Sequence, residues 1–410
     1  AVYVQDGLDI ILLDQLFEKH YQPGIIATRM QSKEIPDEIK QPVLAFELPP
    51  QIKITSPQPD YISVNEQINI TITATDMGGG VDEIRLYHNG KLIDGTQRGF
   101  KPKSSKGNSE TLNFNVYLAD GENHFHALAY SQQRVESLRD QIVVHHKATS
   151  IGKPSMHIIS VALNEYANPR YNLNYAISDS EAFVDALDAR ASGIFSDRFI
   201  KKVYNSNATK SNIKATIDSI RQVAKFEDVF VFYYAGHGVM SSGMGDLKSE
   251  FFLVPHDITK MYDADDLLMR KGISASELAE ISKSLRPQKQ LFILDACQSG
   301  GALQSMMVRG AAEEKAIAQL SRSTGTFIIA ASGSEQYATE VETLGHVIFT
   351  YSILQAFQGA CKSLDGRITV NLLKACIEDL VPELSRQHKG QPQFPTGYGF
   401  GQDFPIGIVR

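Results

Sequence analysis

A histidine and a cysteine each lie near the end of an apolar run in this chain. His237 belongs to Val229–Gly238 (VFVFYYAGHG). Cys297 belongs to Gln290–Gly300 (QLFILDACQSG). Both runs have the length and the β-branched or aromatic content of a buried parallel strand. Parallel strands of an open sheet end at one edge, where such sheets bind ligands, so the imidazole and the thiol can meet in one crevice. A cysteine nucleophile with a histidine base is the chemistry that this pair supports.

Each of these residues alone also has an ordinary structural interpretation. A free cysteine is commonly an inert buried thiol, and a histidine between two glycines can simply occupy a tight turn. Gly236 and Gly238 flank His237 and predict open space on both sides of the imidazole, while two glycines shortly after Cys297 allow a substrate chain to approach closely. The joint occurrence of the pair at two predicted strand ends favours catalysis.

The elements around the pair alternate between strand and helix from residue 148 onward. Besides the two runs above, strands are predicted at 156–163, 199–204 and 326–331, and helices at 174–191, 213–224, 274–285, 346–358 and 370–384. Ser274 and Glu277 form a capping box that marks the start of one helix. The alternation predicts an α/β domain over residues 148–410, with a mostly parallel sheet and helices on both faces.

The part of the chain before residue 148 has a different pattern. Short strands are predicted at 52–56, 68–75, 83–88, 111–118 and 124–130, and Asn89–Gly90 is a hairpin turn signal. This spacing predicts a small all-β sandwich over residues 49–147. It contains no reactive cluster, so a spacer or docking role is expected. Residues 1–48 are expected to form a helix over Leu8–His20 and a connector broken by prolines.

Composition excludes several classes of protein. The chain has 410 residues and a net charge of −7, so electrostatics gives no reason to expect nucleic acid or an anionic membrane as partner. No apolar run approaches the length of a membrane span. The three cysteines do not suggest a disulfide framework, and they suit a reducing, cytoplasmic compartment. The chain starts at Ala1 without a secretory signal or an initiator Met, which suggests processing or a fragment of a longer protein.

Two short motifs resemble a known family. Tyr234–Gly238 (YAGHG) and Asp295–Gly300 (DACQSG) are similar to the two catalytic motifs of the caspase–metacaspase clan of cysteine peptidases, including its bacterial members. The resemblance spans about residues 156–400 in the order of the clan, and Leu173–Asp179 (LNYAISD), Phe251–Asp257 (FFLVPHD) and Gly345–Gln358 agree with it. The preceding β region resembles bacterial immunoglobulin-like modules. The resemblance implies a caspase-like peptidase domain preceded by an immunoglobulin-like sandwich.

The resemblance also implies roles for individual residues. Cys297 would attack the scissile carbonyl of a protein or peptide substrate, and His237 would handle the proton for the leaving amine. The backbone N–H groups of Cys297 and Gly238 would form the oxyanion hole, which contributes about 3–4 kcal/mol to transition-state stabilisation.

Specificity follows from two carboxylates that match the metacaspase pattern. Asp295 stands where caspases that cut after Asp carry Gln, and Asp179 is the second acid of the expected S1 pocket. Two carboxylates at the base of one slot select Arg or Lys at P1, although Asp179 could instead be an exposed acid in the first turn of a helix. The chain departs from the metacaspase pattern at Ala235, where Ser is usual, and at Tyr175, where Cys is usual.

Other functions in the same clan, and outside catalysis, stay open at this point. A partner-specific protease of the separase or CHAT branch shares the same His–Cys sheet. A catalytically idle scaffold is the alternative from another class, although keeping both His237 and Cys297 argues against it. No cofactor or metal is expected, and no acidic loop resembles an EF-hand that would bind activating calcium. A sensor or repeat domain upstream of Ala1 is a further expectation from bacterial relatives.

The segment Gly300–Gly325 lies where clan members often carry a cut between two subunits. It contains three basic residues that are each followed by a small one, at Arg309, Lys315 and Arg322. Arg309–Gly310 is the preferred autoprocessing site, because residues 311–320 read as a helix that resists cleavage. The alternative is that the segment is only a surface connection.

Overall fold

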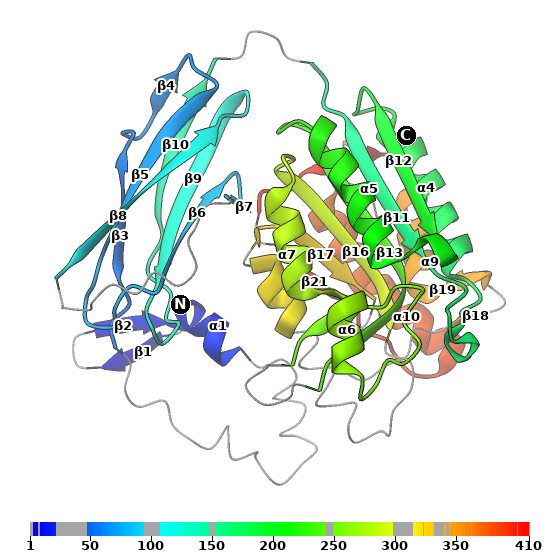
Figure 1. Cartoon of the computed structure of the whole chain (residues 1–410). Coiled ribbons are helices and arrows are strands. Elements are labelled where there is room, and N and C mark those ends of the chain that lie inside the picture. The colour runs from blue at the N-terminus through cyan, green and yellow to red at the C-terminus, as the bar shows by residue number, and fades with distance from the viewer. Residues whose placement is uncertain are drawn as a thin grey trace. The chain divides into compact units, whose positions relative to one another are not determined.

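The computed structural model describes residues 3–6, 9–21, 47–93, 107–147, 152–242, 249–297, 315–322, 324–331, 340–341, 344–361, 363, 365–399 and 401–409. It divides into two compact units, Ala1–Ile151 and Gly152–Arg410 (Figure 1). The first unit is all-β apart from short helical turns, and the second is a helix-covered α/β sheet.

The start of the chain differs from its predicted helix. Strands β1 (Tyr3–Asp6) and β2 (Asp9–Leu12) form an antiparallel hairpin, and only then follow the 3-10 turn η1 (Leu13–Leu16) and the short helix α1 (Phe17–His20). The prediction of one helix over Leu8–His20 was therefore wrong in its first half. The helical spacing of the apolar residues did not decide the structure here, because residues 9–12 pair with residues 3–6 as a strand.

The remainder of the first unit is a sandwich of two sheets, as the sequence predicted. One sheet has the order β3 (Gln51–Ser56), β5 (Gln67–Thr75), β8 (Ser109–Tyr117). The other has the order β4 (Tyr61–Ser63), β10 (Asp140–His146), β9 (Gly121–Tyr130), β6 (Glu83–His88), β7 (Lys91–Leu92). The core between them is formed by alternate residues of both sheets, among them Ile72, Phe114, Leu86, Phe125 and Ile142. The predicted Asn89–Gly90 turn joins β6 to β7 with positive φ at both residues.

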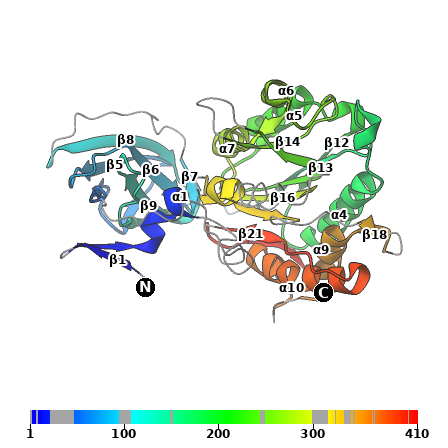
Figure 2. The same cartoon turned by 90° about the horizontal axis from the view of Figure 1, so that it is seen from below.

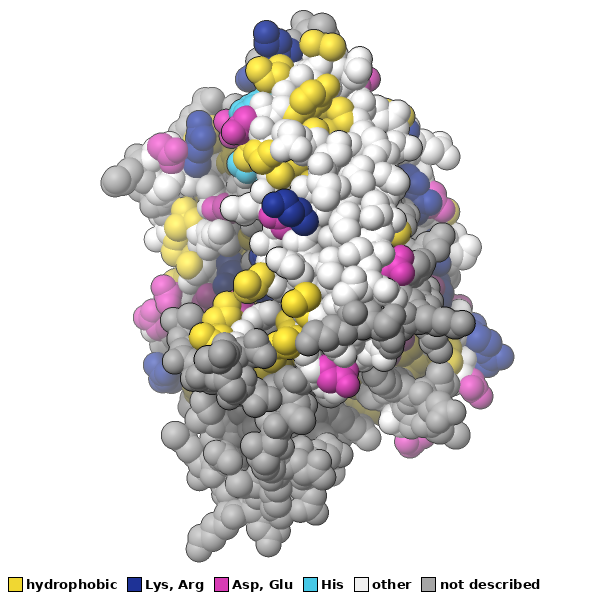
Figure 3. All heavy atoms as spheres, turned by 90° about the vertical axis from the view of Figure 1, so that its left-hand side faces the viewer, with side chains coloured by type: hydrophobic (Ala, Val, Ile, Leu, Met, Phe, Trp, Pro, Cys, Tyr) yellow, Lys and Arg dark blue, Asp and Glu magenta, His cyan; other side chains and the backbone are white. Residues whose placement is uncertain are grey.

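The outer face of the β3–β5–β8 sheet is polar and almost uncharged. Thr and Asn side chains pair across β5 and β8, as in the hydrogen bonds Asn69–Asn115 (3.0 Å), Thr71–Asn113 (2.9 Å) and Thr75–Ser109 (2.9 Å). Figure 3 looks onto this side, where white side chains and backbone outnumber charged groups. Cross-strand pairs of this kind stabilise an exposed sheet face.

The second unit is built on one sheet with the order β12 (Arg198–Tyr204), β11 (Met156–Ala162), β13 (Val229–Met240), β16 (Lys289–Cys297), β17 (Phe327–Ala330), β21 (Thr396–Tyr398). All neighbours pair in parallel except β17 and β21. The end of β13 also pairs with β14 (Phe251–Leu253), which pairs with β15 (Ile273–Ser274). The predicted mostly parallel sheet is confirmed.

Helices cover both faces of this sheet (Figure 2). One face carries α4 (Ala176–Ala191), α9 (Ile348–Gln358) and α10 (Val370–Lys389), and the other carries α5 (Lys210–Val223) and α7 (Ala275–Ser284). Strand β13 shows why both faces are covered, because Phe232 and Tyr234 join one core cluster while Val231 and Tyr233 join the other. The capping box of Ser274 and Glu277 starts α7 as predicted.

Shorter elements complete the unit. They are η2 (Pro169–Tyr171), η3 (Asn205–Asn207), α6 (Asp265–Lys271), β18 (Glu340–Val341), β19 (His346–Val347), β20 (Arg367–Thr369) and β22 (Pro405–Ile408), together with helical residues 315–322. Among the described residues, no helix is both long and apolar enough to cross a membrane.

Two of the three cysteines form a disulfide, which corrects the expectation from their odd number. Cys361 lies just after α9 and Cys376 lies in α10, with their Cα atoms 5.8 Å apart. Counting cysteines could not reveal this, because the bond depends on α9 and α10 packing against the same face of the sheet. Cys297 is the cysteine left outside this bond.

Candidate active site

The sheet register brings the predicted dyad together. In the parallel pair β13–β16, His237 and Cys297 are Cα partners, and they form the last pair of that ladder. Strand β13 does not end there as predicted but continues to Met240, and from Gly238 onward it pairs with β14. His237 therefore lies where β13 exchanges one neighbour for another, at the carboxyl end of the parallel ladder.

Aromatic side chains fill the space next to the two glycines that flank His237, so this space is not open. A Cβ atom at Gly236 would lie 2.7 Å from the hydroxyl oxygens of Tyr166 and Tyr234, and one at Gly238 would lie 2.7 Å from the ring of Phe251. His237 is accordingly only 4 % exposed. The expectation of free space on both sides of the imidazole was wrong, because β-sheet neighbours and Tyr166 occupy it.

The ring of His237 is oriented by a backbone carbonyl. Its Nε2 lies 2.8 Å from the carbonyl oxygen of Tyr171, at the end of η2. A carbonyl oxygen only accepts hydrogen bonds, so Nε2 carries the proton and donates it. In the neutral ring the basic nitrogen is then Nδ1, which is the nitrogen that can take a proton.

The backbone of His237 is held by two buried tyrosines. Its N–H donates to the Tyr166 hydroxyl at 3.0 Å, and its carbonyl oxygen lies 2.9 Å from the Tyr234 hydroxyl. Burial raises the pKa of both tyrosines above the ordinary value, so both keep their protons. The Tyr166 ring also lies against the imidazole, with ring centroids 5.0 Å apart.

The structure also brings the two predicted pocket acids into one buried cluster. Asp179 lies in the first turn of α4 with a fully buried side chain, and Asp295 lies on β16 at 6 % exposure. The alternative that Asp179 is an exposed helix acid is therefore excluded. Burial and then the charge of Asp179 raise the pKa of Asp295 to about 7. The cluster also includes Thr350, whose hydroxyl donates to Asp295 Oδ2 at 2.7 Å, and Tyr233, whose hydroxyl lies 2.8 Å from Thr350.

His346 is the member of this cluster that sequence reasoning missed most clearly. Its Nδ1 lies 2.5 Å from Oδ1 of Asp179, and the backbone N–H of Val347 donates to Oδ2 at 3.2 Å. His346 lies in β19 and Thr350 lies in the first turn of α9, so helical spacing does not link the two. Nothing local in the sequence links these residues to Asp179.

Arg309 lies outside the described residues, as does most of the segment Gly300–Gly325. The alternative sites Lys315 and Arg322 fall in helical residues 315–322, and Arg322 is buried. Within the described ranges, no group of three or more His, Cys, Asp or Glu residues could hold a metal ion.

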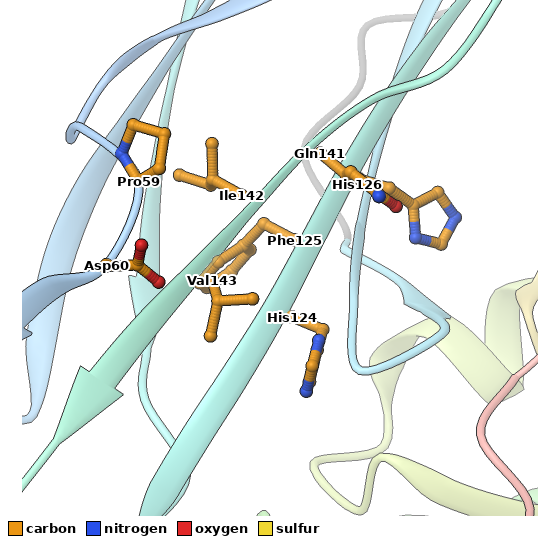
Figure 4. Close-up of a pocket in the computed structure, with 8 residues that line it drawn as sticks. All are labelled: Pro59, Asp60, His124, Phe125, His126, Gln141, Ile142 and Val143. Atoms are coloured by element: carbon orange, nitrogen blue, oxygen red, sulfur yellow. The ribbon is translucent and has the colours of Figure 1, made fainter.

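A separate hollow lies on the first unit, over the paired strands β9 and β10 and beside the segment before β4 (Figure 4). Its volume is about 270 Å³, and it is lined by Pro59, Asp60, His124, Phe125, His126, Gln141, Ile142 and Val143. In Figure 4, His126 and Gln141 lie together on one side and Pro59 and Asp60 on the other. Its lining contains no Cys, Ser or Thr nucleophile, so covalent catalysis of the kind discussed above does not arise there.

Comparison with known families gives two matches along the chain. The model of the caspase domain (peptidase C14) matches residues 158–396, and the model of a bacterial Ig domain matches residues 50–127.

Individual relatives are more distant. A probable protease from a Desulfuromonadales bacterium is 31 % identical over 93 residues, which is 22 % of this chain and 10 % of that protein. The chain therefore matches only a small part of the length of this curated relative.

A crystal structure of a Geobacter sulfurreducens protein covers 61 % of this chain and 94 % of its own, with 15 % identity and a TM-score of 0.42. Fibronectin(III)-like modules of Clostridium thermocellum CbhA cover 24 % of this chain and 97 % of their own, with 19 % identity and a TM-score of 0.20. Both TM-scores are low, so the family assignment rests on the family models alone.

Proposed function

Because this chain belongs to the caspase-domain family of peptidases, we propose that it is a cysteine endopeptidase with Cys297 as nucleophile and His237 as base. The observation that carries the proposal is the register of the sheet, which makes these two residues Cα partners at the end of the parallel ladder. The Tyr171 carbonyl supports it, because it leaves Nδ1 of His237 as the basic nitrogen.

The reaction follows from these positions. The Cys297 thiol gives its proton to Nδ1 of His237, and the sulfur attacks the carbonyl carbon of the scissile bond. The backbone N–H groups of Gly238 and Cys297 stabilise the oxyanion that forms, and the protonated His237 gives its proton to the leaving amine. Water then attacks the thioester with His237 again as base, which releases the acid product and restores the thiol.

The buried acids support a preference for Arg or Lys at P1. A guanidinium or an ammonium would compensate the negative charge of Asp179 and Asp295, whereas an Asp at P1 would add a like charge in a site with little solvent. We therefore propose cleavage after basic residues.

The dyad is tested by substitution of its two members. Cys297→Ala is expected to abolish turnover of a fluorogenic Arg peptide, and His237→Ala is expected to lose nearly as much, because the two act as a unit. Labelling by a peptidyl-Arg chloromethylketone should follow the same pattern. A wild-type protein that is folded but not labelled would favour the idle scaffold, and turnover by purified Cys297→Ala would refute the assignment.

The pocket is tested by the isosteric changes Asp179→Asn and Asp295→Asn. Each is expected to lower kcat/KM for Arg peptides more than tenfold relative to peptides with a neutral P1. A bound guanidinium favours the ionised form of both carboxyl groups, and losing one partner of a desolvated charge pair costs about 2–5 kcal/mol. A positional-scanning peptide library, with and without calcium, measures the preference directly. A preference for Asp at P1 in the wild type would overturn the acidic pocket.

Autoprocessing at Arg309–Gly310 stays a proposal of the same kind. An acidic S1 pocket would accept this bond if the segment reaches the site. Incubating wild type beside Cys297→Ala and mapping the fragments by mass spectrometry tests it, with Arg309→Ala as the site-specific control. A wild-type chain that stays intact while it cleaves an Arg peptide would show that processing is not required.

A further inference from the structure

His346 engages the acid that is proposed to receive the substrate. Its Nδ1 lies 2.5 Å from Oδ1 of Asp179, while the N–H of the next residue, Val347, donates to Oδ2 at 3.2 Å. Both residues form β19, directly before α9. One short segment therefore engages both carboxylate oxygens of Asp179.

Exposure distinguishes His346 from the other members of the cluster. The Asp179 side chain is 0 % exposed and that of His346 is 23 % exposed. Thr350 and Tyr233 are fully buried, and Asp295 is nearly so. Within this ion pair, solvent therefore reaches His346 and not Asp179.

The second acid does not offer an easier route. The Thr350 hydroxyl donates to Oδ2 of Asp295, and the Tyr233 hydroxyl lies 2.8 Å from the Thr350 hydroxyl. Burial and the neighbouring Asp179 raise the pKa of Asp295 to about 7, so near neutral pH much of it is uncharged. The charge that attracts a basic group then resides mainly on Asp179, which His346 already pairs.

We propose that His346 is a specificity-determining residue that acts as an internal substitute for the basic P1 side chain and must be displaced from Asp179 when substrate binds. This inference rests on the proposed function and adds to it a competitor built into the pocket. A guanidinium suits the displacement, because its fork can donate two parallel hydrogen bonds to one carboxylate. A side chain that cannot pair with a carboxylate leaves His346 in place.

The kinetic test replaces His346 by residues that compete less well. His346→Asn keeps an N–H donor for Asp179 but cannot carry charge, and His346→Ala removes the donor. For Arg peptides, KM of His346→Asn is expected to fall about tenfold with kcat little changed. In the wild type, the apparent affinity for substrate is reduced because His346 pairs with Asp179 in a fraction of the molecules. Peptides with citrulline at P1, the neutral isostere of Arg, should show no such gain. His388→Asn, an exposed histidine on α10, is the matched control.

A KM for Arg peptides that is unchanged or higher in a folded His346→Asn protein would overturn the proposal, since His346 would then only brace Asp179. An equal fall in KM for Arg and citrulline peptides would also overturn the proposal. His346→Ala can lose stability by leaving Asp179 unpaired, which is why the Asn variant decides the question.

A binding test separates this proposal from the peptidase assignment. In ¹⁵N-labelled Cys297→Ala protein, agmatine, a small guanidinium, is expected to shift the imidazole signals of His346, and the added change Asp179→Asn should abolish the shift. If agmatine shifts these signals while the wild type cleaves no peptide, the peptidase assignment is refuted, but the competition between His346 and a guanidinium for Asp179 is supported. Signals of His346 that do not move at saturating agmatine refute the competition, whatever the activity.

Discussion

At the scale of single residues, partners decide the protonation of the site. The Tyr171 carbonyl assigns the proton of His237 to Nε2, and so leaves Nδ1 as the basic nitrogen of the neutral ring. Asp295 shows the opposite situation, in which burial and a neighbouring carboxylate resist ionisation. His237 on β13 and Asp295 on β16 thus differ in how their surroundings set their protonation, although the two strands are neighbours.

Asp295 predicts a pH dependence of stability. Its pKa rises from 3.8 in the unfolded chain to about 7 in the folded protein, so between these values the folded state binds more protons. The contribution of Asp295 to the free energy of unfolding is therefore fully present below its pKa in the unfolded chain. It is lost as the pH rises toward its pKa in the folded protein. Asp295→Asn, which keeps an acceptor for Thr350, should remove this loss, which is at most about 4 kcal/mol for such a shift.

Thermal denaturation of wild type and Asp295→Asn between pH 4 and pH 8 measures this effect, with Tm of the variant expected to rise relative to wild type as pH rises. Asp266→Asn, an exposed acid of α6, serves as the control. Parallel Tm curves for wild type and Asp295→Asn would contradict the raised pKa.

At the scale of elements, β13 is the strand that organises the site. It pairs with β11 and β16 along its first part and with β14 beyond His237. This change of partner crowds the backbone, so that Phe251 of β14 packs against Gly238. Glycine is required here for close packing rather than for an unusual φ.

Gly238→Ala is therefore expected to destabilise the protein by about 1–3 kcal/mol, because an added methyl group must displace the Phe251 ring in a packed core. It should also lower kcat, since Gly238 is proposed to supply an oxyanion N–H. Chemical denaturation and peptide turnover measure the two effects. Gly152→Ala, where a Cβ meets nothing within 4 Å, is the control. Wild-type stability in Gly238→Ala would show that the ring can give way.

At the scale of the whole chain, the peptidase unit has a covalent constraint near its surface helices. The Cys361–Cys376 disulfide joins the end of α9 to α10, and α9 also carries Thr350 of the acid cluster. The disulfide was not expected from the odd number of cysteines, whereas the cytoplasmic location stays a prediction.

Removing this bond by the pair of changes Cys361→Ala and Cys376→Ala is expected to lower stability by about 3 kcal/mol, as for a loop of about 15 residues. Denaturation midpoints with and without reductant test this in wild type, and non-reducing peptide mapping tests for the bond itself. Free thiols at both positions in protein purified without reductant would refute it. Cys297, kept in the double variant, should still react with the chloromethylketone.

Features that repeat over short distances could be predicted from the amino-acid sequence. Alternation with period two identified the sandwich strands, apolar runs followed by small residues identified β13 and β16, and helical spacing with a capping box identified α7. The pairing of His237 with Cys297 also followed, because parallel strands that end in reactive residues share one edge of the sheet.

The side chains that fill the space around those residues could not be predicted and are seen in the folded structure alone. His346 and Asp179 are 167 positions apart, and Tyr166 and His237 are 71 apart, so no local pattern could join either pair. The same holds for the disulfide between α9 and α10, and for Phe251 beside Gly238. Local periodicity records which face of an element is buried, but the identity of the neighbour depends on how distant elements pack, and packing is a property of the whole fold.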